Sequence, residues 1–294
     1  MSIKTILVGL ALESDSDPVA ARAIRLARQH GAKLIAVHVI EQSMLDGHEP
    51  PLPGDRHAII SILEEEARDR MRALLQDLPI ETEIHVEAGD PFEILDRLHR
   101  QHSVDLLVIG PGRADNIRER VFGSTADQLI CQNRSPILVV KTEPRGDYSR
   151  IAAAIDFSPM SQEAVAGTIR LAPDAALDLV HAVDIPLHFM QAMRKAGTKQ
   201  AEIDRYREAR MQNAREKVQS VYVSGGTLPE RTEISVLSGS VGDVLIRLAS
   251  AGAMDLIALG TQARQAVPRL VMGSVARKVL RAARSDVLVV PASQ

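Results

Sequence analysis

The sequence lacks tryptophan, and aromatic residues make up only 2% of its 294 residues. Proteins that hold single-stranded nucleic acid stack the bases on aromatic side chains, so this class of protein is disfavoured. The 45% of residues that are hydrophobic must therefore be mainly Ala, Val, Ile and Leu. Such a composition is typical of parallel strands whose two faces are covered by helices. A formal net charge of −3 gives no reason to expect a polyanion as partner.

Cysteine and long apolar runs are also scarce. Cys131 is the single cysteine, which excludes an intramolecular disulfide and is typical of a reducing compartment. No run reaches the roughly 18 apolar residues that a membrane-spanning helix needs. The stretch "IKTILVGLAL" (3–12) is followed by acidic "ESDSD" (13–17) instead of a small-residue cleavage site, so it is expected to be a first strand and not a signal peptide. We therefore expect a cytoplasmic protein that neither inserts into membranes nor binds nucleic acid.

What the chain does contain is an internal repeat. The segment "TEIHVEAGDPFEILDRLHRQHSVDLLVIG" (82–110) aligns without a gap on "TEISVLSGSVGDVLIRLASAGAMDLIALG" (232–260). A repeat that spans nearly half the chain indicates two domains and not a solenoid. We expect a first domain at 1–144, a linker rich in charge at 145–150, and a second domain at 151–294.

Each copy alternates predicted strands and helices. In the first copy the strands are expected at 5–10, 33–40, 82–88, 105–110 and 137–141. This alternation predicts an α/β fold, with a doubly wound, five-stranded parallel sheet in each of two tandem domains. Such sheets bind ligands beyond the carboxyl ends of their strands, where the strand order reverses.

Helix boundaries are marked by short polar signals. Asp17-Pro18 and Asp90-Pro91 each pair an N-cap residue with proline at the first helical position, and Gly31 ends the first helix. For the second copy, the expected N-cap residues are Ser161 and Ser240. A long amphipathic helix is expected where apolar residues recur at helical spacing, namely at Ile59, Leu63, Ala67, Met71, Leu74 and Leu78.

The loop after the fourth strand is the candidate site in each copy. "GPGRADNIRERVFGS" (110–124) and "GTQARQAVPRLVMGS" (260–274) both begin with glycine after an apolar run and end with Gly-Ser before a helix. The first turn of a helix presents unpaired N–H groups and partial positive charge, which suit a phosphate. The alternative is that glycine only permits tight packing of strand and helix while serine caps the helix.

These loops, followed by a helix and a closing apolar strand, resemble the universal stress protein family in its tandem, two-domain form. The second copy shows the resemblance best, in "IDFSPMS" (155–161), "DLIALGT" (255–261) and "MGSVARKVLRAARSDVLVV" (272–290). The resemblance implies a fold of the adenine nucleotide alpha hydrolase type. It also implies that ATP or AMP, with Mg²⁺, is a candidate ligand, since many members bind these nucleotides while others lack the glycines and bind none.

In the second domain the resemblance assigns a nearly complete nucleotide site. Its residues are Ile155, Asp156, Leu259, Gly260, Ala263, Gly273, Ser274 and Val275. Asp156 stands where the family has an acidic residue that contacts the nucleoside, and the glycines would hold the phosphates. Ala263 departs from the pattern, because its methyl group narrows the approach that a middle glycine leaves open.

In the first domain the corresponding site is expected to be degenerate. Its residues are Gly110, Arg113, Gly123, Ser124 and Thr125. Ala11 stands in place of the acidic residue, and Arg113 in place of the middle glycine. The guanidinium of Arg113 could itself hold an anion, but we expect this loop to be structural.

Other polar residues suggest weaker sites. His99 and His102 lie at i, i+3 and could share a metal, but no carboxylate or cysteine pattern completes a site. We therefore predict no metal site and interpret both as surface histidines near a helix end. His38 and His181 occupy equivalent positions in the second strand of each copy, and are interpreted as buried histidines bonded to backbone. The last helix carries Arg277, Arg281 and Arg284 with Lys278, interpreted as a solvated face that could draw anions if it abuts the second site with Arg264 and Arg269.

Neither a Ser/His/Asp set nor paired carboxylates gather at the predicted strand ends, so we expect no dedicated enzyme, with any ATP hydrolysis slow and incidental. The sequence leaves two function hypotheses open besides that of a nucleotide-using enzyme. One is a stress-response module switched by ATP or AMP in the second domain. The other is a nucleotide-independent scaffold that binds a protein partner or a small or lipid-like anion, with Met44, Leu45, Phe189, Met190 and Met193 lining an apolar cleft.

The closing strands of the two copies, "ILVVK" (137–141) and "VLVVP" (287–291), are apolar. Each would be an exposed sheet edge if its domain stood alone, and exposed edges invite pairing. The resemblance implies that the two domains pair through these strands within the chain, and that the chain further associates as a homodimer. The protein client remains open.

Overall fold

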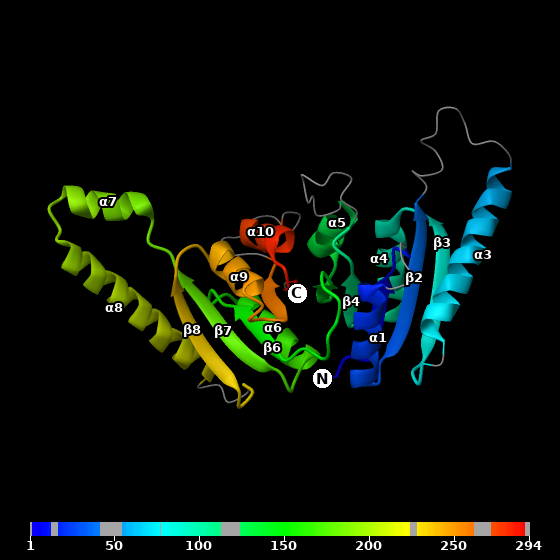
Figure 1. The fold of residues 1–294 in the computed structure, drawn as a ribbon, viewed down its shortest axis with the longest axis horizontal. Coiled ribbons are helices and arrows are strands. Elements are labelled where there is room, and N and C mark those ends of the chain that lie inside the picture. The colour runs from blue at the N-terminus through cyan, green and yellow to red at the C-terminus, as the bar shows by residue number, and fades with distance from the viewer. Residues whose placement is uncertain are drawn as a thin grey trace. The chain divides into compact units, whose positions relative to one another are not determined.

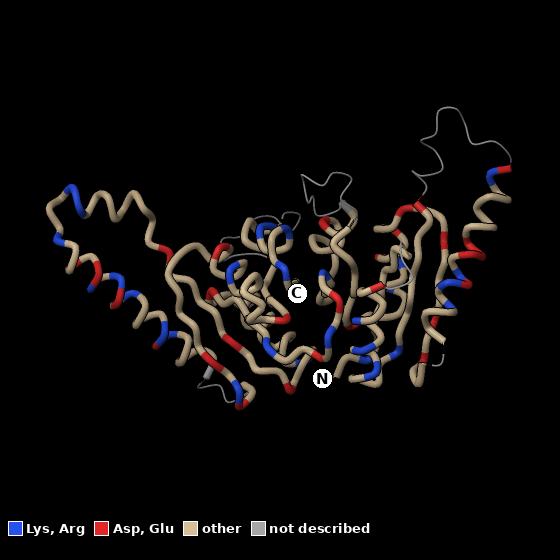
Figure 2. The backbone as a smooth tube through the Cα atoms, in the orientation of Figure 1, with Lys and Arg blue, Asp and Glu red and all other residues tan. Residues whose placement is uncertain are grey.

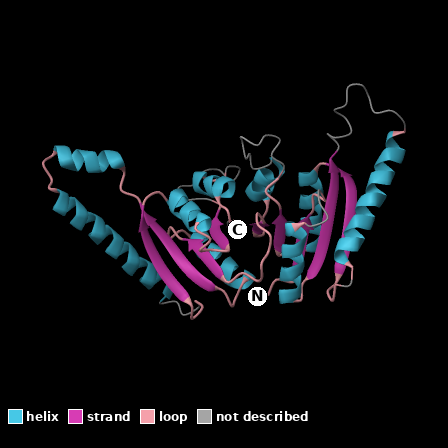
Figure 3. Cartoon of the chain, viewed as in Figure 1, coloured by secondary structure: helices cyan, strands magenta, loops and turns pink. Residues whose placement is uncertain are grey.

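The computed structural model divides the chain into two compact units, unit 1 (Met1–Asp147) and unit 2 (Tyr148–Gln294). It describes residues 2–12, 17–41, 55–76, 78–112, 124–223, 228–261 and 272–291. In each unit, parallel strands are flanked by helices (Figure 1, Figure 3), which confirms the predicted α/β fold in tandem. In the described part of the chain, no helix has the length and apolarity that crossing a membrane requires.

The described part of unit 1 contains five strands. They are β1 (Thr5–Gly9), β2 (Lys33–Glu41), β3 (Thr82–Gly89), β4 (Leu106–Ile109) and β5 (Ile137–Val139). Their spatial order is β3-β2-β1-β4-β5, and the neighbouring strands are parallel. Leu7, Ile35 and Leu107 are fully buried, as expected for a sheet that is covered on both faces. The order reverses between β1 and β4, so the crevice beyond their carboxyl ends is where this architecture places a ligand.

The described helices of unit 1 are α1 (Pro18–His30), α3 (Arg56–Leu75), α4 (Pro91–His102) and α5 (Ser124–Gln132). Of these, α1, α4 and α5 begin at the expected residues, and α1 ends at the expected glycine. Asp17 accepts hydrogen bonds from the N–H groups of Val19 and Ala20, and Gly31 closes α1 at a φ of 61°. Each of these interactions satisfies backbone groups that a helix end leaves unpaired.

Unit 2 repeats the same order of strands. They are β6 (Arg150–Ala154), β7 (Ala176–Val183), β8 (Thr232–Ser238), β9 (Leu256–Gly260) and β10 (Asp286–Val290). Within this unit the spatial order is β10-β9-β6-β7-β8, again parallel. The switch point therefore lies between β6 and β9, as it lies between β1 and β4 in unit 1.

The helices of unit 2 correct one predicted N-cap. They are α6 (Pro159–Leu171), α7 (Leu187–Lys195), α8 (Gln200–Val218), α9 (Val241–Ser250) and α10 (Ser274–Ala282), with a π-helical turn η1 (Gln219–Val223) after α8. Ser240 caps α9 as predicted. The prediction for Ser161 is wrong, because Ser158 is the N-cap of α6 and accepts from the N–H of Ser161. Ser161 itself is buried inside the helix, where its hydroxyl contacts Tyr222.

The two long helices α3 and α8 pack on the outer strands of their units. On α3 the buried residues are Ala67, Met71 and Leu75, whereas Leu63 is exposed and Leu78 lies beyond the helix end. The predicted apolar stripe is therefore correct at buried Ala67 and Met71 and wrong at Leu63 and Leu78. Along α8, basic and acidic side chains alternate (Figure 2), and Ile203 and Val218 are its buried residues.

The residues expected to form a linker are hydrogen-bonded to the unit on their own side. The carbonyl of Gly146 accepts from Arg22, and Asp147 pairs with Arg25 in unit 1. On the other side, the Tyr148 hydroxyl donates to buried Asp286 over 2.6 Å in unit 2. These residues are therefore anchored within the units themselves.

Candidate functional site

The two copies form the same turn where their first strand ends. In unit 2, His181 donates from Nδ1 to the carbonyl oxygen of Ile155 over 2.8 Å. In unit 1, His38 makes the equivalent bond to Leu10, also over 2.8 Å. The predicted bond of both histidines to backbone is confirmed, but both are half-buried and not buried as expected. Each imidazole links the second strand to the residue that follows the first strand, and so stabilises the turn that begins there.

A strained residue follows in each turn. Phe157 in unit 2 has a φ of 66°, and Leu12 in unit 1 has a φ of 54°. Residues other than glycine rarely adopt the left-handed region, and holding one there costs on the order of 1–3 kcal/mol. The surrounding hydrogen bonds must therefore outweigh this cost, and such positions cluster where a site is being shaped.

Asp156 lies immediately before the strained residue and stabilises the start of α6. Its Oδ1 accepts a hydrogen bond of 2.9 Å from the N–H of Ser158 and one of 2.5 Å from the Ser158 hydroxyl. An aspartate that bonds the backbone two residues ahead forms a local turn of its own. Asp156 thus has a structural function as well as the ligand contact that the sequence predicts, and Ala11 of unit 1 can supply neither.

Aromatic and cationic side chains cover this turn in unit 2. The ring of Phe157 lies 4.8 Å from that of His181, and Nζ of Lys217 on α8 lies 4.4 Å from the Phe157 ring centre. A cation at that distance from an aromatic face is attracted by the ring quadrupole. Unit 1 carries aliphatic Leu12 at the corresponding position, so it cannot form this arrangement. Phe157 and Lys217 were not found from the sequence, because nothing in their local pattern places α8 over the end of β6.

The start of α10 returns to the end of β9. Ala153 of β6 pairs with Ala258 of β9, so the carboxyl ends of the two strands lie side by side, with Asp156 following β6 and Thr261 following β9. The N–H of Gly273 donates to the carbonyl of Thr261 over 3.0 Å. The helix N-terminus at Ser274 is therefore close to the switch point, and Gly273, which has no side chain, leaves the first-turn N–H groups without a side-chain cap. This is the arrangement that suits an anion.

The opening glycine of each loop has a steric reason. A Cβ at Gly260 would lie 3.1 Å from Cβ of Met160 and 3.4 Å from its backbone, and a Cβ at Gly110 would lie 3.4 Å from a methyl group of Val19. Met160 and Val19 are the second residues of α6 and α1. The alternative that glycine permits tight packing of strand and helix thus accounts for Gly260 without a ligand, and more weakly for Gly110.

The rest of the predicted site is only partly placed. Leu259 is buried in β9, Ser274 and Val275 begin α10, and Ser124 and half-buried Thr125 begin α5. Arg113, Gly123 and Ala263 lie outside the described residues, as do Arg264 and Arg269. On α10, Arg281 is exposed as expected, but Arg277 is half-buried, and Arg284 is exposed but lies beyond the end of the helix. Lys278 forms an ion pair with Asp243 of α9.

The apolar residues expected to line a cleft are only partly described. Met44 and Leu45 are outside the described residues, and Met193 is half-buried. The ring of Phe189 on α7 lies 6.2 Å from that of Tyr206 on α8, and Arg207 donates to the sulfur of Met190. Phe189 and Met190 therefore contact α8.

The interpretation of His99 and His102 as surface histidines is wrong. Both are half-buried, because the last turn of α4 packs against neighbouring elements. Nε2 of His99 lies 2.9 Å from the Ser135 hydroxyl, and burial lowers the pKa of its imidazole. His102 instead faces Glu83 on β3, with Nε2 and Oε1 3.9 Å apart. The two histidines therefore have separate partners and do not act as a pair.

Comparisons with known proteins agree with this architecture. The model of the universal stress protein family matches residues 2–141 and again residues 147–291. Universal stress protein A homolog 1 of Coxiella burnetii is 30% identical over 145 residues, which are 49% of this chain and 96% of that protein. A universal stress protein of Methanocaldococcus jannaschii is 28% identical over 125 residues, 42% of this chain and 72% of that protein.

Among solved structures, a universal stress protein of Archaeoglobus fulgidus has a TM-score of 0.65 at 14% identity, with 98% of each chain covered. At that identity the likeness shows the fold alone, but it extends over both units. The family model matches twice, once in each half of the chain. The chain therefore belongs to the universal stress protein family, with one family domain in each of its two units.

Proposed function

We propose that the protein is a cytoplasmic stress-response module that binds an adenine nucleotide, ATP or AMP, in unit 2. The nucleotide would lie beyond the ends of β6 and β9 and act as a switch, without catalytic turnover. The observation that supports the proposal is the parallel pairing of these two strands at the switch point, where Asp156 follows β6 and the N-terminus of α10 is hydrogen-bonded to Thr261 after β9.

The groups at this point complement the parts of a nucleotide. The first-turn N–H groups of α10 suit the phosphates, with Mg²⁺ sharing their charge. The carboxylate of Asp156 can accept hydrogen bonds from ribose hydroxyls, as the family resemblance implies. Phe157 adds an aromatic surface and Lys217 a positive charge. Unit 1 has Ala11 in place of Asp156 and Leu12 in place of Phe157, which supports a single nucleotide per chain.

Binding without turnover is part of the proposal. Hydrolysis needs a positioned base for the attacking water. Oδ1 of Asp156 already accepts two hydrogen bonds from Ser158, and Nδ1 of His181 is held by the Ile155 carbonyl. Both groups are thus engaged in maintaining the turn, which supports a binding function over a catalytic one.

Calorimetry with ATP-Mg²⁺ and with AMP tests the proposal. We expect one site per chain, and we expect Asp156→Ala to weaken binding about tenfold or more, because a hydrogen bond to a charged group contributes roughly 1.5–3 kcal/mol. Asp17→Ala is the matched control, since it removes an aspartate that stabilises a helix start in unit 1. Absence of heat with the wild type, or equal affinities for the wild type and Asp156→Ala, would contradict the proposal.

A second candidate is a nucleotide-independent scaffold for a protein partner or another small ligand. It is favoured by the exposure of apolar side chains on α7, where Leu187 is 64% and Phe189 45% exposed. Thermal-shift measurements with nucleotides and with fatty-acid ligands separate the two candidates. A shift with nucleotides alone would count against the scaffold, and a shift with fatty acids alone would count against the nucleotide switch.

A further inference from the structure

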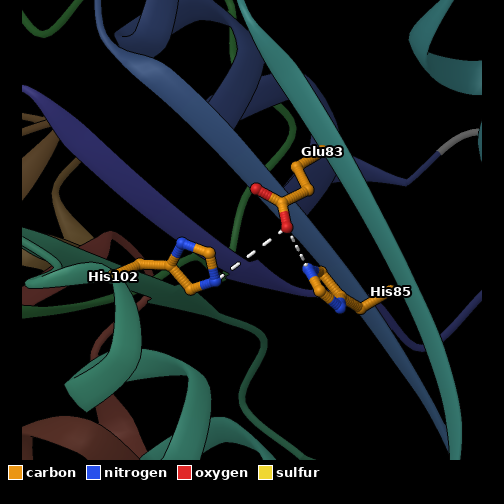
Figure 4. A group of neighbouring side chains, drawn as sticks. All are labelled: Glu83, His85 and His102. Carbon is orange, nitrogen blue, oxygen red and sulfur yellow. Dashed lines mark hydrogen bonds and ion pairs between the residues drawn. The ribbon is translucent and has the colours of Figure 1, made fainter.

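A carboxylate and two imidazoles converge in unit 1, away from the candidate nucleotide site. Glu83 and His85 are on β3, and His102 is the last residue of α4. Oε1 of Glu83 lies 2.8 Å from Nε2 of His85 and 3.9 Å from Nε2 of His102, as Figure 4 shows. One ligand atom from each residue lies within 4.8 Å of the other two. We call these three residues the Glu83 cluster.

The fold brings the Glu83 cluster together from distant parts of the sequence. Successive side chains of a strand alternate between its faces, so Glu83 and His85 share the face on which the end of α4 lies. Glu83 is the second residue of β3, so the cluster is near the amino ends of the strands. A ligand bound there would be independent of a nucleotide at the carboxyl ends. The three side chains are 35%, 23% and 25% exposed, accessible to an ion yet partly shielded from water.

The charges around the cluster favour a cation. Lys33 pairs with Oε1 of Glu81 and with Oε2 of Glu83, which leaves Oε1 of Glu83 directed at the imidazoles. Arg97 pairs with Glu87. Three glutamates therefore face two basic residues, a surplus of one negative charge beside two imidazoles that are neutral when they bind a metal.

Glu87 lies near the second ring nitrogen of His85, where metal-bound imidazoles usually have a carboxylate partner. Oε1 of Glu87 lies 3.9 Å from Nδ1 of His85, on the side of the ring opposite Nε2. A carboxylate at the second ring nitrogen orients the imidazole and strengthens the coordinating nitrogen. Arg97 in turn holds Glu87 in place. The ring of His85 is thus placed between a ligand carboxylate on one side and an orienting carboxylate on the other.

We propose that Glu83, His85 and His102 bind one divalent transition-metal ion of the zinc class. Two imidazoles and one carboxylate suit Zn²⁺ and Co²⁺, and three protein ligands leave a fourth position for water. Tetrahedral coordination at about 2.0–2.1 Å places ligand atoms roughly 3.3 Å apart, so modest side-chain rotations suffice. The ion would replace the proton that His85 Nε2 now shares with Glu83, and that proton would move to Nδ1, which faces Glu87.

Unit 2 serves as an internal comparison. The gapless repeat aligns Glu83 with Glu233, His85 with Ser235, and His102 with Gly252. Unit 2 therefore keeps the carboxylate but neither imidazole, and Ser235 donates to Asp178 instead. The site thus belongs to unit 1 alone, and the expected stoichiometry is one ion per chain.

Titration of the tag-free full chain with Zn²⁺, followed by calorimetry, tests this proposal. We expect one ion per chain, and affinity weakened more than about tenfold in His85→Gln and in His102→Gln, because even losing an orienting group outside the ligands costs roughly 10–100-fold. His57→Gln is the matched control, because His57 is 95% exposed on α3 and outside the cluster. The control should bind Zn²⁺ as the wild type does.

Two further readouts separate loss of the site from loss of the fold. Zn²⁺ should raise the melting temperature of the wild type and of His57→Gln, but not of the two cluster variants. Co²⁺ should give a visible absorption spectrum of nitrogen-ligated metal that His102→Gln lacks while its circular dichroism is unchanged. No Zn²⁺ binding by the wild type, equal affinity in the cluster variants, or equal loss in His57→Gln would overturn the proposal.

Discussion

Gly260 is a residue that the packing of the fold requires and that also matches the sequence pattern of a phosphate-binding loop. It ends β9 where the first turn of α6 comes closest, and the nearest atoms include the backbone of Met160. A flexible side chain could move aside, but the backbone of a helix anchored by Asp156 and Ser158 cannot do so easily. A glycine at the start of such a loop is therefore weak support for phosphate binding when considered alone.

We expect Gly260→Ala to destabilise unit 2 by about 1–3 kcal/mol, the usual cost of forcing extra atoms into a packed interior. The midpoint of urea unfolding, followed by circular dichroism, measures the change. Gly146→Ala is the control, because a Cβ there would meet nothing within 4 Å, and surface changes usually stay within about 0.5 kcal/mol. An unchanged midpoint for Gly260→Ala would show that α6 can shift, and the steric explanation would be wrong.

The equivalent strands β2 and β7 differ in the polarity of one buried side chain. His38 and His181 are equivalent positions, and three residues before them stand Ile35 in β2 and Asp178 in β7. Asp178 is 8% exposed, and its Oδ2 accepts a hydrogen bond from Ser235 while Oδ1 is buried without a partner among the described residues. Burial raises the pKa of the Asp178 carboxyl, with the nearby Glu233 adding to the effect.

We expect Asp178→Asn to stabilise unit 2 at neutral pH. When folding raises the pKa of a carboxyl, its ionised form lowers the stability at any pH above the folded pKa. As the pH falls through the folded pKa this cost shrinks, because the folded protein binds the proton more tightly than the unfolded chain does, and below the unfolded pKa the cost is gone. The advantage of the variant over the wild type should thus shrink in acid. Urea unfolding between neutral and acidic pH measures this, with Asp174→Asn, an exposed change at the turn before β7, as the control. An advantage independent of pH would contradict the assignment.

At the scale of the whole molecule, two units built on one template differ in local chemistry. Unit 2 has Asp156 and Phe157 at the end of its first strand, whereas unit 1 has Ala11 and Leu12. Unit 1 has the Glu83 cluster, of which unit 2 keeps the glutamate alone. The strand order of each unit, taken by itself, ends at its closing strand, β5 or β10. These strands are apolar, and exposed apolar edges invite pairing. The predicted pairing of the units can therefore be tested at these strands.

We expect 1–147 and 148–294, produced as separate chains, to associate, as measured by native mass spectrometry. The carbonyl of Pro136 and the N–H of Val140, at the two ends of β5, form hydrogen bonds to β4. Because alternate residues of a parallel strand bond to the same neighbour, the N–H of Val139 is directed to the opposite edge of β5. Val139→Pro should weaken association by about tenfold, since a net hydrogen bond contributes roughly 1 kcal/mol and proline also restrains the edge. Val139→Thr keeps the N–H and is the control. Separate units, or equal association of both variants, would contradict the pairing.

The spacing of apolar and polar residues was sufficient to predict the tandem α/β fold, the caps at Asp17 and Ser240, and the roles of His38 and His181. The wrong N-cap at Ser161 was avoidable, since Ser158-Pro159 repeats the signal of Asp17-Pro18. These features depend on local interactions, and repetition in the chain made the strand positions easier to recognise. In each case, the residues that interact are close in sequence or occupy equivalent strand positions.

Tertiary structure alone decided which distant groups meet. His102 was assigned to the surface because it lies near the predicted end of its helix, yet packing of α4 brings it to Glu83 and His85. Lys217 reaches Phe157 only because α8 packs back on β7 and β8, and the closeness of Met160 to Gly260 depends on how α6 packs. The sequence by itself therefore determined the fold and the frame of the candidate nucleotide site. The partners of individual side chains followed from packing and strand register, which bring together residues whose separation along the chain carries no signal.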